Sequence, residues 1–214
     1  MALYKITIKL LSPLVTPLKG DTIWGHIVWG IANHEGDEAV AEFLERQKSS
    51  PEIVISSAFP SGYICRPLPL PKERTESLNA EKYSDIKKEK KRRLVKACDF
   101  LDECELPKIE LQSTPFTTET STHNTIDRES GTVLEGALYS VEQAWTRYNE
   151  FDIYAESSLS SERIENLFEW AFENGYGADS STGNGKIEIV KKSVVKVIPK
   201  INSNLYMALA TFVI

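Results

Sequence analysis

The sequence predicts an α+β fold, in which an antiparallel sheet packs against amphipathic helices, on the basis of three patterns. Residues 4–10 alternate apolar with polar side chains, which is typical of a half-buried strand. Residues 161–174 place apolar side chains at the i, i+3, i+4, i+7 and i+8 spacing of one helix face. Residues 21–33 carry a second continuous apolar stripe, and strand-like segments separate the two helices. A sheet covered by helices accounts for this order of elements.

The first helix is expected to begin at Asp21 or Thr22, because the side chains of both residue types can cap a helix. Trp24 lies on the apolar stripe and is expected to join the core. Gly25 and Gly30 lie inside the helix and lower its stability, so each is expected to permit the close approach of another group.

The remaining elements are short, since turn residues interrupt the apolar pattern. Ser160 or Ser161 is expected to cap the clear helix, and Gly175 to end it. Taken together, the elements most economically form a ferredoxin-like (RRM-like) β-α-β-β-α-β sheet with long insertions. They comprise, besides those above, a helix at 38–47 and strands at 53–56, 63–65, 133–141, 150–156, 186–197 and 205–214.

Length and composition fit one domain that spans residues 1–214, with 41% hydrophobic and 26% charged residues. No apolar run approaches the ~20 residues of a membrane-spanning helix, and the first residues contain no signal-peptide block. The three cysteines form no C-x-x-C pair, so neither a disulfide framework nor a zinc site is expected. We therefore expect a cytoplasmic protein without metal or cofactor.

Charge is distributed unevenly along the chain, whose net value is -6. Residues 87–96 carry seven Lys or Arg and one Glu, which leaves 18 basic and 30 acidic residues elsewhere. A basic segment on an acidic body suggests one surface for a polyanion and others for protein partners, although a solvated linker has the same composition. Lys91, Arg92 and Arg93 are its candidate contacts, within a basic and partly mobile insertion expected at about 72–125.

A glycine-rich loop is predicted between the last helix and the strand that follows it, at residues 175–186. Four glycines fall within eleven positions of this loop. Glycine lets backbone N–H groups lie close to a phosphate or to another backbone, so the pattern fits a phosphate cradle and a structural turn equally well. The Walker A order is missing, and a Rossmann fingerprint would follow a strand rather than a helix.

The loop also fits the pattern G-φ-G-x(5)-G-x-G, where φ is apolar, and so resembles the C-terminal glycine-rich loop of the RAMP superfamily of CRISPR-associated proteins. Residues 20–31 (GDTIWGHIVWGI) resemble the first helix of that superfamily. Residues 123–131 (HNTIDRESG) resemble the H-N-x-I-D-R-x-[TS]-G segment of its type III members. The three segments occur in the expected order, and the similarity is to subunits that cap the crRNA 5′ end in type III-A (Csm) complexes.

The resemblance implies a non-catalytic RNA-binding subunit of an antiviral type III interference complex. Such a subunit would hold the 5′ handle of crRNA and dock the large signalling subunit and the backbone subunits. Members generally continue past the glycine-rich loop, whereas this sequence ends at Ile214 after one predicted strand pair. The implied RNA contacts are Gly177, Ser181, Gly183, Gly185 and Lys186 in the loop, and His123, Asn124 and Arg128 in the H-N-x-I-D-R segment.

Simpler interpretations stand beside several of these contacts. Arg128 can form an ion pair with Asp127 or Glu129, and Asn124 can form a turn. Trp29 and Tyr176 are the aromatic residues best placed to stack on bases.

Two other functions remain open from the sequence. The first is a metal-independent crRNA-processing endoribonuclease of the same superfamily, with His26 or His123 as acid or base. His34 is expected only to complement the end of the first helix, and Asp21 only to cap its start. The second is a protein–protein adaptor that uses the acidic body and contacts no RNA.

Overall fold

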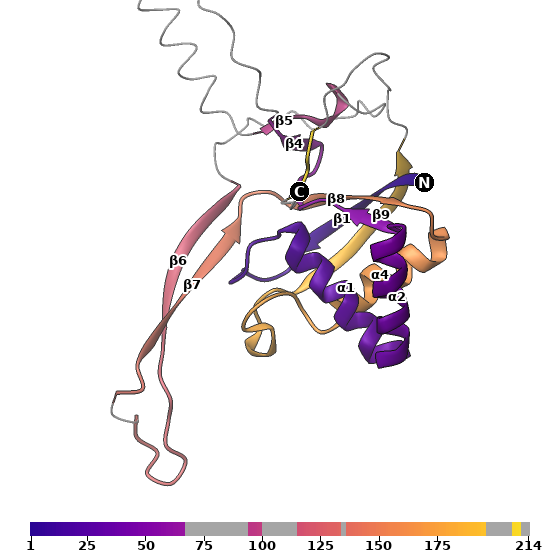
Figure 1. Cartoon of the computed structure of the whole chain (residues 1–214). Coiled ribbons are helices and arrows are strands. Elements are labelled where there is room, and N and C mark those ends of the chain that lie inside the picture. The colour runs from indigo at the N-terminus through magenta and orange to yellow at the C-terminus, as the bar shows by residue number, and fades with distance from the viewer. Residues whose placement is uncertain (67–93, 100–114, 134–135, 196–206, 211–214) are drawn as a thin grey trace, which may run out of the picture.

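The structure is a computed structural model that describes residues 1–66, 94–99, 115–133, 136–195 and 207–210 (Figure 1). Its central antiparallel sheet has the strand order β2-β8-β1-β9, and a short strand, β3, also pairs with β8. The three described helices lie together on one face of this sheet, which confirms the predicted combination of helices with antiparallel strands (Figure 1). The bounds are β1 Ala2–Leu10, α1 Gly20–Glu35, α2 Asp37–Ser49, β2 Ile53–Ile55, β3 Phe59–Pro60, β8 Glu150–Ser157, α4 Ser161–Glu173 and β9 Ile187–Val195.

The main core lies between the sheet and the helices. Alternate residues of β1 face α1 and α4, and the apolar stripe of each helix packs against them, as predicted. Burial of such side chains stabilises a fold by about 25 cal/mol per Å² of apolar surface. The fully buried members of this core include Ile6, Ile8, Ile23, Ile27, Ile31, Phe151, Ile153, Ile164, Leu167 and Phe168.

The strand β8 is buried on both of its faces, although the sequence alternates polar with apolar residues there. A second, two-stranded sheet, β4 (Tyr63–Cys65) with β5 (Leu94–Lys96), lies on the side opposite the helices (Figure 1). Asp152 is fully buried on that side, where its carboxylate accepts hydrogen bonds from Thr7 Oγ1 (2.8 Å) and the Gly62 N–H (2.9 Å). These donors compensate the loss of water around the carboxylate, so a polar position can lie inside the fold.

The helices α1 and α4 differ in how they begin. Lys19 occupies the N-cap of α1 without a capping side chain, and the Gly20 N–H instead donates to Ser57 Oγ (3.1 Å). The predicted cap by Asp21 or Thr22 is therefore wrong, because a serine from a distant part of the chain supplies the acceptor. The prediction for α4 is confirmed, since Ser160 Oγ accepts from the Arg163 N–H (3.2 Å). Its predicted stop is confirmed as well: Gly175 follows the last turn with a φ of +83°.

The two glycines inside α1 have different surroundings. A Cβ on Gly30 would lie 2.8 Å from the Cβ of Trp170 on α4, so this glycine permits the predicted close approach. A Cβ on Gly25 would have no heavy atom within 4 Å, so none of the described residues makes the close approach predicted at Gly25. Trp24 packs against the core and stacks on Phe43 of α2, as predicted (centroids 5.5 Å apart).

A long hairpin of β6 (Phe116–His123) and β7 (Tyr139–Thr146) extends away from the central sheet as an arm (Figure 1). The sequence predicted no strand at β6, because its run of threonines and serines carries no periodic apolar pattern. The strand predicted at 133–141 begins instead at Tyr139.

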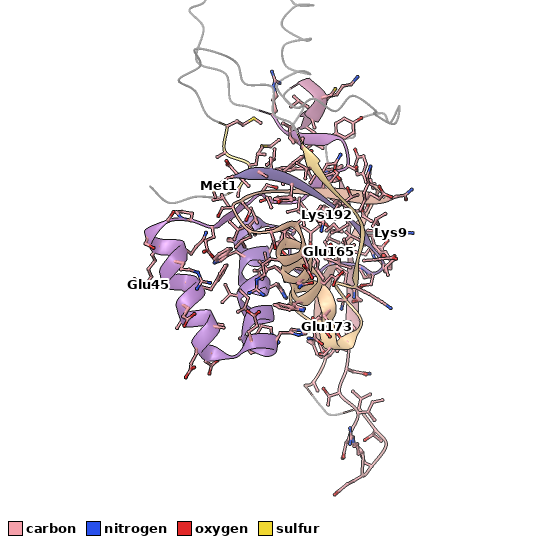
Figure 2. The ribbon with its side chains drawn as sticks, turned by 90° about the vertical axis from the view of Figure 1, so that its right-hand side faces the viewer. Met1, Lys9, Glu45, Glu165, Glu173 and Lys192 are labelled. Carbon is pink, nitrogen blue, oxygen red and sulfur yellow. The ribbon has the colours of Figure 1, made fainter. Side chains whose placement is uncertain are left out.

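The strand predicted at 205–214 is only partly covered by the structure. Of that range the structure describes residues 207–210, and these are not in a strand. Most of the insertion expected at 72–125 lies outside the described residues, which include there only β5, the 3₁₀ turn η1 (Ala97–Asp99) and the start of the hairpin. On the helical side, Lys192 of β9 extends over α4 and bonds to Glu165 and to the Ser161 carbonyl (Figure 2).

Candidate functional site

The glycine-rich loop, residues 175–186, is anchored to the protein by Tyr176. This side chain is fully buried, and its hydroxyl donates to the Pro17 carbonyl oxygen (2.7 Å). Its ring stacks on His26 of α1 with the centroids 4.9 Å apart. Burial raises the pKa of Tyr176 to about 12, so the hydroxyl stays protonated. The prediction that Tyr176 stacks on a base is therefore wrong, since none of the ring is exposed.

Two glycines of the loop serve close packing within the protein. A Cβ on Gly177 would lie 2.5 Å from the Cβ of Thr16, and a Cβ on Gly185 would lie 1.9 Å from the Tyr176 carbonyl oxygen. Both residues also have positive φ angles, +76° and +67°. Their N–H groups are engaged, because Gly177 donates to His26 Nε2 (3.0 Å) and Gly185 to the Pro13 carbonyl (2.8 Å). At these two positions the loop packs tightly against the protein and offers no backbone donor to a phosphate. We call the packed contacts of Tyr176, Gly177 and Gly185 with His26, Thr16 and Pro13 the clasp.

The outer end of the loop has a different character. The short 3₁₀ turn η2 (Ser180–Thr182) and Gly183 are largely exposed, and a Cβ on Gly183 would meet no heavy atom within 4 Å. The Lys186 backbone N–H donates to Ser12 Oγ (2.8 Å), while the Lys186 side chain is exposed. Of the predicted loop contacts, Ser181, Gly183 and Lys186 therefore lie where a ligand can reach them.

His26 connects α1 to the loop. Its Nε2 accepts the Gly177 N–H, so the imidazole is neutral and carries its proton on Nδ1, toward the backbone of Ala171. Burial lowers the pKa of His26, and the hydrogen bond with Ala171 opposes that shift only in part. One ring nitrogen thus holds the loop, and the other is directed at the backbone of α4.

The hairpin carries the other predicted residues. His123 ends β6 and stacks on Tyr139 of β7 (centroids 5.4 Å apart), and its Nε2 lies 3.0 Å from Ser121 Oγ. Asn124 and Arg128 are exposed in the connection between the two strands. The hairpin that carries these groups projects from the central sheet as an arm (Figure 1).

A turn around Asp127 orders the end of the hairpin. Its carboxylate accepts the Glu129 N–H (3.0 Å) and the Ser130 hydroxyl (2.9 Å), and these bonds hold the pKa of Asp127 below its usual range. Within the described part of the chain, no carboxylate lies at ion-pair distance from Arg128. The alternative in which Arg128 pairs with Asp127 or Glu129 is therefore not realised.

Residues 11–17 join the loop to the base of the hairpin. Leu14 and Ala144 exchange both backbone hydrogen bonds (2.9 and 2.7 Å). Gln143 Nε2 donates to Asn184 Oδ1 in the loop (2.9 Å). No sequence pattern predicts this contact, because the partners are 41 residues apart and both are ordinary polar residues.

One face of the hairpin is thereby turned toward the loop. Side chains of a strand alternate between its faces, so Tyr139 and Trp145 share the face of Gln143, and His123 lies opposite Tyr139. Trp145 and Tyr139 are 45% and 54% exposed, and neither was predicted as a site residue. The exposed Glu119 lies directly opposite Gln143 on the same face. We call this the loop–hairpin surface; it consists of Glu119, His123, Tyr139, Gln143, Trp145, Ser181, Gly183 and Lys186.

Other predicted features are only partly covered by the structure. Lys91, Arg92 and Arg93 lie outside the described residues. Trp29 is 64% exposed on α1 and is not part of the loop–hairpin surface. In the described ranges, no group of three His, Cys, Asp or Glu could hold a metal ion, and no helix has the length and hydrophobicity to span a membrane.

Comparisons with known proteins identify structures but no sequence relatives. No family model and no curated protein matches this sequence. A chain of the crystal structure of the Csm1-Csm4 cassette in complex with cA4 matches with a TM-score of 0.50 and 20% identity, over 78% of this chain and 64% of that one. A chain of the cryo-EM structure of the type III-B Cmr-beta complex bound to cognate target RNA matches with a TM-score of 0.51 and 11% identity, over 91% and 61%. The chain thus spans less than two thirds of either neighbour.

The fold is therefore the one found in subunits of type III CRISPR effector complexes. Within that class, the first neighbours come from Csm1-Csm4 cassettes, so the predicted likeness to a RAMP-like Csm subunit is confirmed at the level of the fold.

Proposed function

We propose that this protein is a non-catalytic, cytoplasmic RNA-binding subunit of a type III CRISPR effector complex. It holds the 5′ handle of crRNA and docks the signalling and backbone subunits. The observation that carries the RNA-binding part is the loop–hairpin surface, in which the glycine-rich loop and the hairpin face meet through Gln143 and Asn184. The shared fold supports the assignment to such complexes.

We also propose that the sheet and helices form a ferredoxin-like fold. The sheet order β2-β8-β1-β9, with α1 following β1 and α4 joining β8 to β9, supports a ferredoxin-like arrangement. Folds of this kind bind single-stranded RNA through stacked aromatic side chains and through donors to phosphate.

The chemistry of the loop–hairpin surface suits a single-stranded RNA. Trp145 and the stacked pair of Tyr139 and His123 offer aromatic faces, and stacking of one base on such a face contributes about 1–3 kcal/mol. Lys186 and the Ser181 hydroxyl are donors for phosphate oxygens at the other side of the surface. Arg128 extends the set of cations toward the end of the arm.

The state of the histidines favours binding over catalysis. An endoribonuclease needs a histidine that is free to take or give a proton at the reacting group. His26 uses both ring nitrogens within the protein: Nε2 accepts the Gly177 N–H of the loop, and the proton on Nδ1 points toward the backbone of Ala171 in α4. His123 Nε2 lies at hydrogen-bond distance from Ser121, on the stacked ring pair.

Titration of the protein with a labelled RNA that begins with the repeat-derived handle tests the proposal. We expect binding without cleavage, and an affinity that falls with salt by roughly 0.7 log unit per log unit of salt for each phosphate neutralised. A matched RNA with a scrambled 5′ end reports whether the handle sequence matters. No detectable RNA binding would favour the adaptor, and cleaved RNA would favour the endoribonuclease.

A further inference from the structure

The outer face of α1 has features that the fold of this chain does not explain. Gly25 lies in the middle of the helix, where glycine is about 1 kcal/mol less favourable than alanine. Its missing Cβ relieves no contact inside the described protein, whereas that of Gly30 relieves a contact with Trp170. One turn after Gly25 comes Trp29, which is 64% exposed. A costly glycine beside an exposed tryptophan leaves room for a group that does not belong to the described residues.

The strip around these two residues is uncharged. Thr22, Gly25, Trp29 and Asn33 follow one another at three- and four-residue spacing, so they form one line along the helix, which we call the α1 strip. The chain as a whole is 26% charged. Depletion of charge together with an aromatic residue is the composition of the centre of a protein–protein interface.

The α1 strip is also held rigidly. Behind it, Ile23, Ile27 and Ile31 are fully buried against the sheet. Beside it, His26 is fixed by the hydrogen bond from Gly177 and by stacking on Tyr176. A preformed surface loses little conformational entropy when a partner binds.

The charges around the α1 strip identify the kind of partner. The helices α1, α2 and α4 together carry ten Asp or Glu and three Lys or Arg. All three cations are already paired: Arg163 with Glu35, and Arg46 and Lys48 with glutamates of α2. Labelled members of this acidic layer are Glu45, Glu165 and Glu173 (Figure 2). Glu45 pairs with Lys48, Glu165 with Lys192 of β9, and Glu173 lies at hydrogen-bond distance from His34, so the unpaired charge of the layer comes from its other carboxylates.

Exposed carboxylates bracket the α1 strip itself. Asp21 lies in the first turn of α1, and Asp37 and Glu38 open α2 directly after it. Such a rim repels the phosphates of an RNA and attracts lysine and arginine side chains. The complementary surface is therefore a basic rim around an uncharged, apolar centre.

We propose that the α1 strip is a docking site for a protein subunit whose contacting surface carries Lys and Arg around an apolar patch. The partner's apolar patch covers the indole of Trp29, and its backbone or a side chain occupies the space left open at Gly25. The proposal rests on the proposed function, since that function requires partner subunits, and it names the surface that one of them uses.

The test measures binding of the full chain to three separate probes. These are a signalling subunit and a backbone subunit of a type III complex, and the handle RNA. We expect Trp29→Ala to weaken binding to one of the two subunits at least tenfold, because a buried aromatic residue at an interface centre dominates its affinity. RNA affinity is expected to stay within twofold.

Gly25→Ala separates docking from folding. Alanine favours the helix and meets no atom of the described chain, so this variant is expected to melt at a higher temperature than the wild type and still to bind the subunit more weakly. The double variant Asp37→Lys/Glu38→Lys is expected to weaken the same binding and to reduce its dependence on salt. Val194→Ala, at an exposed valine of β9, serves as the control and is expected to change neither.

The outcomes distinguish the two proposals. Full affinity of Trp29→Ala and Gly25→Ala for both subunits, with a wild type that binds both subunits and RNA, overturns the docking site alone. A tenfold loss of RNA affinity with unchanged subunit binding shows that the α1 strip stacks on RNA, and a loss of self-association shows that it contacts a second copy; either overturns the assigned partner. A wild type that binds neither subunit nor RNA overturns the proposed function and this site with it.

Discussion

The glycine-rich loop turns its polar backbone groups inward, whereas the β6–β7 hairpin presents its distinctive side chains to solvent. The N–H groups of Gly177 and Gly185 donate to His26 and Pro13. Trp145 and Tyr139 on the hairpin remain about half exposed. The two regions lie side by side, yet one is required mainly for the fold and the other is available to a ligand. Glycine-rich sequence therefore indicates close packing as readily as phosphate binding.

The sharpest test of this comparison is Gly185→Ala in the loop. A Cβ there would lie 1.9 Å from the Tyr176 carbonyl oxygen, and φ is +67°, so overpacking and backbone strain act together. We expect a loss of about 3–5 kcal/mol in the free energy of unfolding, measured by urea denaturation. Gly183→Ala is the matched control, because its Cβ has open space and only the φ of +99° is unfavourable. Equal losses for both variants would show that Gly185 is not packed as described.

Trp145→Ala is the counterpart on the hairpin. Since the indole is 45% exposed and the rest of its surface is covered, we expect the free energy of unfolding to fall by about 1–2 kcal/mol, less than for Gly185→Ala. RNA affinity is expected to fall about tenfold, which corresponds to one lost stacking contact. Fluorescence anisotropy with the handle RNA measures the change, and Thr118→Ala on the opposite hairpin face is the control. A variant destabilised as strongly as Gly185→Ala, with unchanged RNA affinity, would reverse the roles of the two regions.

The clasp is also expected to depend on pH through His26. The pKa of His26 is lowered in the folded protein, so between pH 6.5 and that lowered value the unfolded state binds more protons. The contribution of His26 to stability is therefore complete above about pH 6.5 and is lost as the pH falls through the folded pKa. We expect the melting temperature to fall more between pH 7 and pH 5 in the wild type than in His26→Phe. Parallel pH profiles of the two proteins would argue against a neutral His26 in the clasp.

Arg128→Gln is expected to have the smallest effect. Arg128 has no ion-pair partner among the described residues, so its loss leaves the fold unchanged. If it contacts one phosphate, RNA affinity falls a few-fold for any sequence and the slope of affinity against salt becomes smaller by roughly 0.7. Titrations at several salt concentrations measure that slope. An unchanged slope would remove Arg128 from the RNA contacts.

Much of the fold could be predicted from the sequence, because its signals are local. The alternation of residues 4–10 and the apolar face with its Ser160 cap gave β1 and α4 nearly at their observed bounds. The start of α1 was misplaced because Ser57, 37 residues from Gly20, supplies the acceptor. The strand β6 was missed because its partner β7, rather than an apolar pattern, determines it.

The candidate site was predictable only in part. The loop and the H-N-x-I-D-R segment stood out as motifs, but no motif places Trp145 and Gln143 against the loop. That arrangement depends on Leu14 pairing with Ala144, a contact between segments that are distant in sequence. Likewise the burial of Tyr176 follows from its bond to Pro17 and its stacking on His26, and neither partner is marked by the loop sequence.

Ultraviolet crosslinking of the protein to handle RNA, with crosslinked residues mapped by mass spectrometry, tests the central claim most directly. We predict crosslinks at Trp145, Tyr139 and Lys186 on the loop–hairpin surface, and none on the acidic helices α2 and α4. Crosslinks concentrated on those helices, or bound RNA that leaves the loop–hairpin surface unmodified, would contradict the account.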